Sequence, residues 1–434
     1  MLTRRSFLAS AAVLFAACAA PAAPTPTPAP VARAKVVWSN WAVDAGSKAR
    51  LDEQKRLYEA AAPLEVEVQN TPIADYVTKL LASFVSDQAP DVIRLNTDQL
   101  GVLLNRKQIA ELDPLFQSTS DGWLKRSDVK TPIVDKLRIK SALVGLPYGG
   151  DMDALFVNKT LFKGAGLPAP PTKYEDPSWT YARVLELAKQ LTKRRADGAA
   201  EQLGVDVGGY RYEGHVENAG GSWFTADGMT FQGHQAPAVE AIDYLAALVL
   251  THKVAALPGT DDARANSFAS GRLAMSWLGA SQVSNRLADV GNRFEWDVAP
   301  VPRWRNNPLV VKSGFSALSL NARSKARDAA WGLLHWVTGP VGSLPDVETG
   351  WSLPIFSGLD ARYFARTANL SKNLVPALEG VKYPSKFPSW TNPNYAEAWR
   401  RVQTALDLVF LGKGTAGDLL SGAKAEVDAI LAKP

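Results

Sequence analysis

The sequence contains few of the residues that build disulfides and metal sites. It has one cysteine, Cys18, and four histidines, at positions 215, 234, 252 and 335, among 434 residues. A single cysteine cannot form an intrachain disulfide, and no two of the histidines have the spacing of zinc ligands. Nothing in the sequence supports a catalytic triad that uses histidine. We therefore expect neither a metal nor a cofactor.

Long apolar segments and runs of one charge are also scarce. The uncharged run from Phe7 to Ala17 is much shorter than the roughly 20 residues that cross a bilayer, and no later segment reaches that length. The net charge of +5 is small for this chain, and the single basic cluster, at 193–195, ends a predicted helix, where cations are favourable. We expect no membrane-spanning segment and no binding to nucleic acid.

The first 32 residues have the layout of an export signal. Arg4 and Arg5 precede the short apolar run, and Thr3-Arg-Arg-Ser-Phe-Leu8 resembles the twin-arginine signal. Cys18 stands where small residues meet a tail of Pro, Ala and Thr, as in the processing site of bacterial lipoproteins. We expect an export signal over 1–18 with lipid on Cys18, and an extended linker over 19–32. A plain cleaved signal with an incidental cysteine is the alternative.

The rest of the chain is longer than one hydrophobic core usually supports, which predicts two lobes. Alternation and helical spacing predict strands at 35–41, 64–69 and 91–95, with helices at 47–62 and 72–86 between them. Such crossovers join parallel strands in a doubly wound α/β sheet, where ligands bind beyond the carboxyl ends of the strands. No glycine-rich phosphate loop follows these strands, which disfavours a nucleotide site.

This rule selects the side chains that follow the first and third strands. Ser39, Asn40 and Trp41 follow the first strand, and Asn96, Thr97 and Asp98 follow the third. The Trp41 ring could contact a ligand or pack in the core. The Asp98 carboxylate could contact a ligand or cap the next helix.

The segment 142–159 joins two predicted strands through Gly149 and Gly150. Glycines give the backbone the freedom that a crossing between lobes requires. Asp151 and Asp153 lie on one face of the extended chain that follows, because side chains alternate along a strand. Paired carboxylates can transfer protons, or can accept hydrogen bonds from hydroxyls and cations. A solvated turn is the structural alternative.

The remaining chain continues the α/β pattern. Helices are predicted at 159–166, 178–195, 235–252, 325–337, 396–411 and 415–432, strands at 203–207, 296–300 and 315–320, a turn followed by a strand at 267–277, and a loop rich in glycine and aromatic residues at 208–223. Several of the 13 tryptophans fall beside Gly, Ser, Asn or Pro. Core packing is the ordinary role of tryptophan, but rings in polar loops more often make contacts.

Four short motifs follow one another along residues 35–434. They are Gln88-Ala-Pro-Asp-Val-Ile93, Gly145-Leu-Pro-Tyr148 with the run Leu155 to Thr172, Phe268-x-x-Gly-x-x-Ala-Met275, and Ser313-Gly314 before an apolar strand. In this order and spacing they resemble the extracellular solute-binding proteins of bacterial sugar-uptake ABC transporters, the group that includes maltose-binding protein.

The resemblance implies an α/β, two-lobed periplasmic-binding-protein fold of the type II class. Each lobe would be a doubly wound, mostly parallel sheet flanked by helices, with the ligand cleft between the lobes. The lobes would exchange segments: 33–149 and 281–335 would form lobe one, and 150–280 and 336–434 would form lobe two.

The function implied by the resemblance is binding, not catalysis. The protein would be the exported, extracytoplasmic substrate-binding component of an ABC importer, tethered to the cell envelope by lipid on Cys18. It would act as a monomer that captures a mono- or oligosaccharide by hinge closure and delivers it to permease subunits in the membrane.

The same resemblance completes the predicted ligand site. Asp151 stands where an acidic residue contacts sugar hydroxyls, and Trp277 and Gly279 follow the Ala-Met turn, where the chain lines the cleft. Aromatic rings cover the apolar faces of sugars, while Asp, Asn and Arg meet the hydroxyls. The predicted set is Asn40, Trp41, Asn96, Asp98, Asp151, Trp223, Trp277, Gly279, Gly314, Trp351 and Trp390.

Other functions stay open at this point. Polyols or sugar phosphates could replace the sugar, but an anion would require arginine in the cleft, and the sequence does not place Arg94, Arg211 or Arg366 there. An exported glycoside-acting enzyme could use Asp151 and Asp153 as its two carboxylates. A surface module without a small ligand is the third alternative.

Overall fold

The computed structural model describes residues 34–41, 45–119, 122–139, 141–208, 212–365, 374–383, 385 and 392–433. The predicted export signal, the linker, the Cys18 modification site and the predicted ligand residue Trp390 lie outside these ranges.

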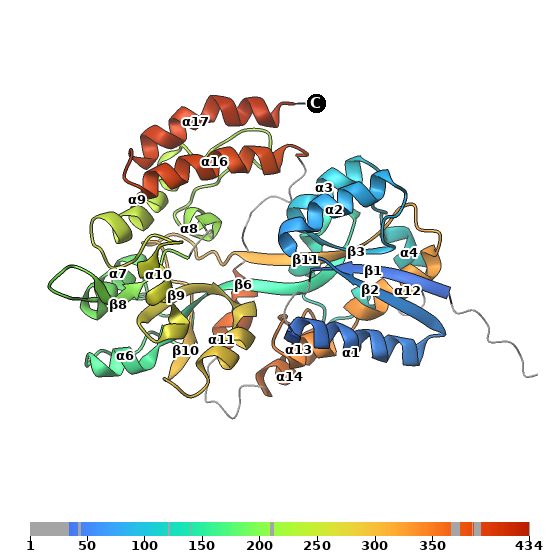
Figure 1. The fold of residues 1–434 in the computed structure, drawn as a ribbon, viewed down its shortest axis with the longest axis horizontal. Helices are drawn as coiled ribbons and strands as arrows, with labels where there is room; N and C mark the ends of the chain where they lie inside the picture. The colour runs from blue at the N-terminus through green and yellow to red at the C-terminus, as the bar shows by residue number, and fades with distance from the viewer. Residues whose placement is uncertain are drawn as a thin grey trace, which may run out of the picture. The chain divides into compact units, whose positions relative to one another are not determined.

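The amino-terminal βαβαβ unit is confirmed. Strands β1 (Ala34–Asn40), β2 (Leu64–Asn70) and β3 (Val92–Asn96) alternate with helices α1 (Ala45–Ala61) and α2 (Ile73–Val85). β1 pairs in parallel with both β2 and β3, which leaves the alternating β2 at the edge of the sheet. Figure 1 shows α2 above these strands and α1 below them, as in a doubly wound sheet.

Two long strands connect this unit to the rest of the molecule. β6 (Leu146–Asn158) and β11 (Ser313–Leu320) pair with each other in antiparallel orientation, and β11 also pairs with β3 in antiparallel orientation. Beyond β3 the strand order is β11-β6-β9-β8-β7. Of the described strands there, only β8 and β9 pair in parallel, so this part of the sheet is mostly antiparallel and differs from the mostly parallel sheet predicted for each lobe. Figure 1 shows β6 and β11 passing together between the two groups of elements.

The second group of elements surrounds the carboxyl half of β6. Its strands and main helices are β7 (Lys193–Arg194), β8 (Ala200–Val205), β9 (Leu273–Gly279), β10 (Trp296–Ala299), α6 (Lys159–Gly164), α7 (Tyr181–Leu191), α8 (Tyr212–Asn218), α9 (Ala236–Leu250), α16 (Tyr395–Phe410) and α17 (Ala416–Leu431). The remaining elements are α3 (Thr97–Asn105), α4 (Asp113–Ser118), α5 (Thr131–Asp135), β4 (Arg138–Ile139), β5 (Ala142–Leu143), α10 (Asp261–Ala265), α11 (Val283–Val290), α12 (Arg327–Thr338), α13 (Leu344–Glu348), α14 (Asp360–Ala365) and α15 (Val375–Glu379).

Helix α7 shows how the local sequence sets these bounds. The Thr180 side chain accepts a hydrogen bond from the Arg183 N–H, which satisfies one free donor of the first turn. The inward face carries apolar residues at helical spacing: Tyr181, Val184, Leu187, Ala188 and Leu191. The helix ends at Leu191, so the basic cluster at 193–195 does not close it as predicted. Two residues of that cluster form β7, which pairs with β8.

The predicted loop at 208–223 contains a helix that the sequence does not reveal. Six of the seven residues of α8 are buried. The buried residues include the polar Glu213, His215 and Asn218, so burial does not follow the pattern of apolar residues by which helices are recognised.

Two separate hydrophobic clusters define two lobes. Lobe one is built on the cluster that includes Trp38 and Tyr148, and lobe two on the cluster that includes Met152 and Trp296. The prediction that the chain re-enters lobe one at residue 281 is wrong as regards the packing of buried side chains. Buried side chains from Val283 to Val311 pack in lobe two, and the return begins near Phe315. The reason is a long-range pairing, because β10 adds to β6 beside the lobe-two core.

The boundary after α12 also differs from the prediction. Val337, Ile355 and Phe356 pack in the core of lobe one, whereas Val347 and Leu353 belong to that of lobe two. Residues 337–356 therefore contribute to both lobes.

In the described part of the chain, no helix has the length and apolar character to span a bilayer.

Candidate functional site

A cavity of about 440 Å³ lies at the crossing of β6 and β11. Its walls come from the end of β3 and the start of α3, from α8 and α16, and from the segments around 281 and 351. The lining residues are Arg94, Asn96, Thr97, Gly149, Gly150, Asp151, Glu213, Ser281, Lys312, Ser313, Gly314, Phe315, Ser316, Trp351, Tyr395 and Trp399. Residues of both lobes therefore face one space beyond the carboxyl end of β3, as the parallel-sheet rule predicts.

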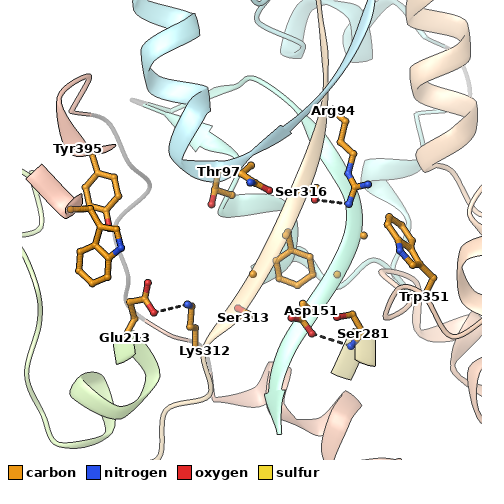
Figure 2. A pocket seen from close by; sticks show the side chains of 16 residues that line it. Arg94, Thr97, Asp151, Glu213, Ser281, Lys312, Ser313, Ser316, Trp351 and Tyr395 are labelled. Atoms are coloured by element: carbon orange, nitrogen blue, oxygen red, sulfur yellow. Dashed lines mark hydrogen bonds and ion pairs between the residues drawn. The ribbon is translucent and has the colours of Figure 1, made fainter. Parts of the chain in front are cut away.

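The aromatic and polar groups occupy different parts of this cavity. Figure 2 shows Tyr395 and Trp351 on opposite sides, with Thr97 and Ser316 above and Asp151 and Lys312 below. Tyr395 and Trp399 are one helical turn apart on α16, and their rings are nearly parallel, with centroids 6.1 Å apart. The arrangement offers ring surfaces at both sides and hydrogen-bonding groups between them.

Asp151 is held in the cavity wall by the backbone. Its Oδ1 accepts hydrogen bonds from the N–H groups of Met152 and Ser281, each at 3.0 Å. Gly279 lies directly behind it, and a Cβ at that position would overlap the carboxylate. Gly279 therefore does not line the cavity as predicted. It provides the space in which the Asp151 carboxylate sits.

The second carboxylate in the cavity is neutralised. Glu213 on α8 accepts a hydrogen bond of 2.7 Å from the Lys312 ammonium group. Asp153, which the sequence pairs with Asp151, is buried and does not line the cavity. The arrangement expected of a two-carboxylate glycosidase is therefore not built from Asp151 and Asp153.

Arg94, the middle residue of β3, lies in the cavity wall, and its side chain is buried. Its guanidinium donates to Asn40 Oδ1 at 3.0 Å and to Ser316 Oγ at 3.2 Å. The same group lies 3.9 Å from the centre of the Trp41 ring and 4.9 Å from that of Trp351. Burial lowers the pKa of Arg94 to about 10, so the group is still charged at neutral pH.

A buried ion pair supports the Trp351 side of the cavity. Arg50 on α1 pairs with Asp346 on α13 and lies 3.7 Å from the centre of the Trp351 ring. Gly149 has a φ of +75°, and a Cβ there would be 2.6 Å from the Trp351 ring. The glycine therefore lets the ring approach the backbone of β6.

Two titratable groups lie beside the cavity at the lobe junction. Lys136 of lobe one donates a hydrogen bond to Ser313 Oγ, and burial lowers its pKa to about 8. Burial raises the pKa of Glu217, on α8, to about 7. These carboxyl and ammonium groups interact electrostatically.

Among the described residues there is no group of three or more His, Cys, Asp or Glu side chains placed to hold a metal ion.

The predicted site residues fall into three groups. Asn96, Asp151, Gly314 and Trp351 line the cavity, and Asn40, Trp41 and Gly279 lie behind its wall. Trp223 and Trp277 are placed elsewhere: both belong to the core of lobe two, with 0% and 4% of their surface exposed. Nothing is described of the Asp98 side chain or of Trp390. Ligand contact by the cavity residues stays a prediction.

The correction for the two core tryptophans has a physical cause. Trp277 stacks on Tyr181 with ring centroids 5.6 Å apart, and Trp223 stacks on Phe231 at 6.4 Å. Neighbouring Gly and Ser residues suggested loops, but packing between aromatic rings buries more apolar surface than a cleft position would.

Several cavity residues were missed by reasoning from the sequence: Arg94, Glu213, Lys312, Tyr395 and Trp399. Thr97 was selected by the strand-end rule together with Asn96, and it lines the cavity. The Tyr395 and Trp399 pair has an i, i+4 spacing on a predicted helix, which places both rings on one face. Glu213 lies on the helix that has no amphipathic pattern.

The family model for "Bacterial extracellular solute-binding protein" matches residues 38–343. The chain belongs to this family. Members bind solutes outside the cytoplasm and are not enzymes, so this chain is an extracellular solute-binding protein. The expected fold is also confirmed over more than nine-tenths of the chain by solved structures.

Three similar proteins illustrate the range of this family. An ABC substrate-binding protein of Listeria monocytogenes in complex with cycloalternan has a TM-score of 0.79 at 20% identity, covering 93% of this chain and 100% of that one. UgpB of Mycobacterium tuberculosis in complex with glycerophosphocholine has a TM-score of 0.76 at 17% identity, covering 91% and 98%. The diacetylchitobiose binding protein of Streptomyces coelicolor is 32% identical over 131 residues, or 30% of this chain and 26% of that one. The two structures establish the fold, and their ligands are properties of those proteins.

Proposed function

We propose that this solute-binding protein captures a carbohydrate, a mono- or oligosaccharide, in the cavity at the β6–β11 crossing. The single observation that carries the proposal is the composition of the cavity wall. Trp351, Tyr395 and Trp399 present aromatic rings, and Thr97 and Asp151 present hydroxyl and carboxylate groups between them. Rings of this kind cover the C–H faces of sugars, while fixed polar groups select the hydroxyls.

The size of the cavity is consistent with such a ligand. Its volume of about 440 Å³ falls in the range of roughly 300–1,000 Å³ that is usual for small-molecule sites. The names of the Listeria and Streptomyces proteins, which bind cycloalternan and diacetylchitobiose, also favour a carbohydrate. UgpB, with its glycerophosphocholine, marks solutes without a sugar as the main competitor.

Capture would involve closure of the two lobes about the crossing strands. β6 and β11 contribute side chains or backbone to the cavity, and β6 packs in the cores of both lobes. Gly149 and Gly150 lie in β6 at the point where its neighbours change from lobe one to lobe two, and β11 has a register shift between Phe315 and Ser316. Backbone freedom at such positions suits a hinge that closes on the solute and opens at the permease.

The anchor is a separate part of the proposal. Lipid on Cys18 would hold the body at the membrane surface, and the Pro/Ala/Thr linker over 19–32 would keep it at a distance from that surface. A tether of this kind would raise the local concentration of the solute-binding protein near its permease.

Thermal unfolding of the full chain with a panel of millimolar sugars, polyols and sugar phosphates tests the proposal. A ligand at 100 times its dissociation constant adds about 2.7 kcal/mol to stability. We expect at least one neutral or charged sugar to raise the melting temperature, with the epimer of that sugar as the matched control. Shifts with polyols or other non-sugar solutes alone would contradict the carbohydrate assignment.

A further inference from the structure

Two buried arginines near the cavity share one acidic partner. Asp346 pairs with Arg50, and it also accepts a hydrogen bond of 3.0 Å from Gln54. Arg50 completes its contacts at the Tyr148 hydroxyl, 2.8 Å away. Arg50 therefore has a counter-ion. Arg94 has no carboxylate in hydrogen-bond contact among the described residues, because its hydrogen-bond partners, Asn40 and Ser316, are both neutral. Asp346 acts on it only through longer-range electrostatics, so the two arginines and one carboxylate leave one positive charge in excess.

The surroundings of Arg94 hold its guanidinium in place without neutralising it. Trp41 and Trp351 lie within 5 Å of it, at 3.9 and 4.9 Å from ring centre to guanidinium carbon. Aromatic faces attract a cation but do not replace a carboxylate. Its Nε is buried and has no hydrogen-bond partner, and only 7% of the residue is exposed.

An unneutralised charge in this position is costly for the ligand-free protein. A buried cation without a counter-ion has lost its hydration and gains little in return. Most buried arginines avoid this by pairing, as Arg50 does. Arg94 differs because it faces the cavity, where a bound molecule could supply the missing negative charge.

We propose that Arg94 binds an oxyanion on the solute, and that the preferred solutes are sugars that carry a carboxylate or a phosphate group. This inference rests on the carbohydrate function proposed above. Arginine suits the task because its planar donors can meet two oxygens of one anion. Figure 2 shows Arg94 reaching toward the cavity from above and Asp151 below it, so the anion and the hydroxyl-bearing ring would occupy different parts of the cavity.

The remaining charges of the cavity agree with one anionic group on the solute. Glu213 and Lys312 neutralise each other. Asp151 accepts two backbone hydrogen bonds and would repel an anion, which directs the charged group toward Arg94 and leaves hydroxyls near Asp151. Carboxylates of uronic acids and phosphates of sugar phosphates share this chemistry, and the experiment separates them.

The test measures dissociation constants of the full chain by calorimetry for matched sets of sugars. The sets are glucose with glucuronate and glucose 6-phosphate, galactose with galacturonate and galactose 6-phosphate, and trehalose with trehalose 6-phosphate. A hydrogen bond to a charged group adds roughly 10- to 100-fold in affinity. We expect one charged sugar to bind at least about tenfold more tightly than its neutral counterpart.

Three variants identify the group responsible. Arg94→Gln should remove this preference, and Arg94→Lys should retain part of it because the charge is kept without the fork of donors. Arg56→Gln, which removes an exposed arginine of the same lobe, should leave the preference unchanged. In the ligand-free state Arg94→Gln should keep or raise the melting temperature, since it removes an uncompensated buried charge.

The outcomes separate this inference from the proposed function. Neutral sugars that bind as tightly as their charged counterparts would overturn the inference and leave the carbohydrate function standing. Equal weakening of neutral and charged sugars by Arg94→Gln would likewise overturn it. Failure of every sugar to bind would overturn the carbohydrate function, and the inference with it. The comparison between sugars uses the unaltered chain, so the test does not depend on the folding of any variant.

Discussion

The Asp151 carboxylate occupies the space that the missing side chain of Gly279 leaves free. Gly279 on β9 is the register partner of Asp153 on β6, two residues along the strand from Asp151. Even a methyl group at 279 would overlap both carboxylate oxygens of Asp151. The backbone of Gly279 has φ −82°, which any residue can adopt. The requirement for glycine is therefore steric, and it links a residue of the lobe-two sheet to a polar group of the cavity.

Gly279→Ala should weaken solute binding by displacing Asp151. Overpacking a tight site costs about 1–3 kcal/mol, so we expect a loss of about tenfold or more in affinity for the best-binding sugar, measured by calorimetry. Gly422→Ala is the matched control, since a Cβ in that helix meets no atom within 4 Å. Unchanged affinity in Gly279→Ala would mean that Asp151 makes no contact with the solute.

Trp351 and Trp223 should respond differently to removal of the ring. Trp351 lines the cavity, so Trp351→Ala should weaken sugar binding by about 1–3 kcal/mol. Trp223 is fully buried in lobe two, so Trp223→Ala should lower the free energy of unfolding by about 3–5 kcal/mol. Denaturant unfolding and calorimetry on both variants check this. If Trp351 has only a structural role, Trp351→Ala will lower the free energy of unfolding. Its affinity for the sugar, calculated for the folded fraction of the variant, will then be unchanged.

These two tryptophans also illustrate what could and could not be predicted from the sequence. Both have Gly or Ser beside them, and only the tertiary packing decides that one enters the core and the other the cavity. The βαβαβ unit was predictable because its periodicities and turn residues are local. Helix α8 was not, because its buried positions include the polar residues Glu213, His215 and Asn218, which no apolar pattern reveals.

The position of the second lobe boundary illustrates the same limit. The pairing of β10 with β6 joins residues 296–299 to 155–158, which are far apart in the chain. No local pattern specifies which earlier strand a later one will join. Arg94 was missed for a related reason. Its immediate neighbours in β3 are apolar, so the local pattern does not indicate a polar site, and its role depends on the pairing of Asp346 with Arg50, which only the tertiary structure reveals.

Breaking the Arg50–Asp346 pair should destabilise the ligand-free protein. Asp346→Ala leaves a buried arginine without its counter-ion, and loss of one partner of a buried pair costs about 3–5 kcal/mol. We expect this loss in the free energy of unfolding from urea titration. Arg56→Gln breaks an exposed pair on the same helix, α1, and should change stability little. Equal effects of the two substitutions would show that the buried pair adds no more than an exposed one.

Glu217 should make the stability of the protein depend on pH between about 4.5 and 7. Burial raises its pKa from 4.5 to about 7, so in this interval the folded state binds more protons than the unfolded state. Its contribution is therefore favourable below pH 4.5 and is lost as the pH rises through 7. Between pH 4.5 and 7.5 the original chain should therefore lose free energy of unfolding that the Glu217→Gln variant keeps. We expect the difference between the two proteins to change by about 1–3 kcal/mol over this interval, in favour of the variant. Parallel pH profiles of melting temperature for the two proteins would contradict this assignment.

Cys18 should control attachment to the membrane without affecting the folded body. The first buried residues of the described structure are in β1, and 34–434 form one compact unit without the preceding segment. We therefore expect deletion of residues 1–32 to leave the melting temperature and sugar affinity unchanged. Full chains with Cys18 or Cys18→Ala, expressed in a bacterium that processes lipoproteins, should differ in fractionation: the first should sediment with membranes and the second should not. Equal membrane retention would favour an uncleaved signal or another anchor. Release of both would favour the plain cleaved signal, in which Cys18 has no role.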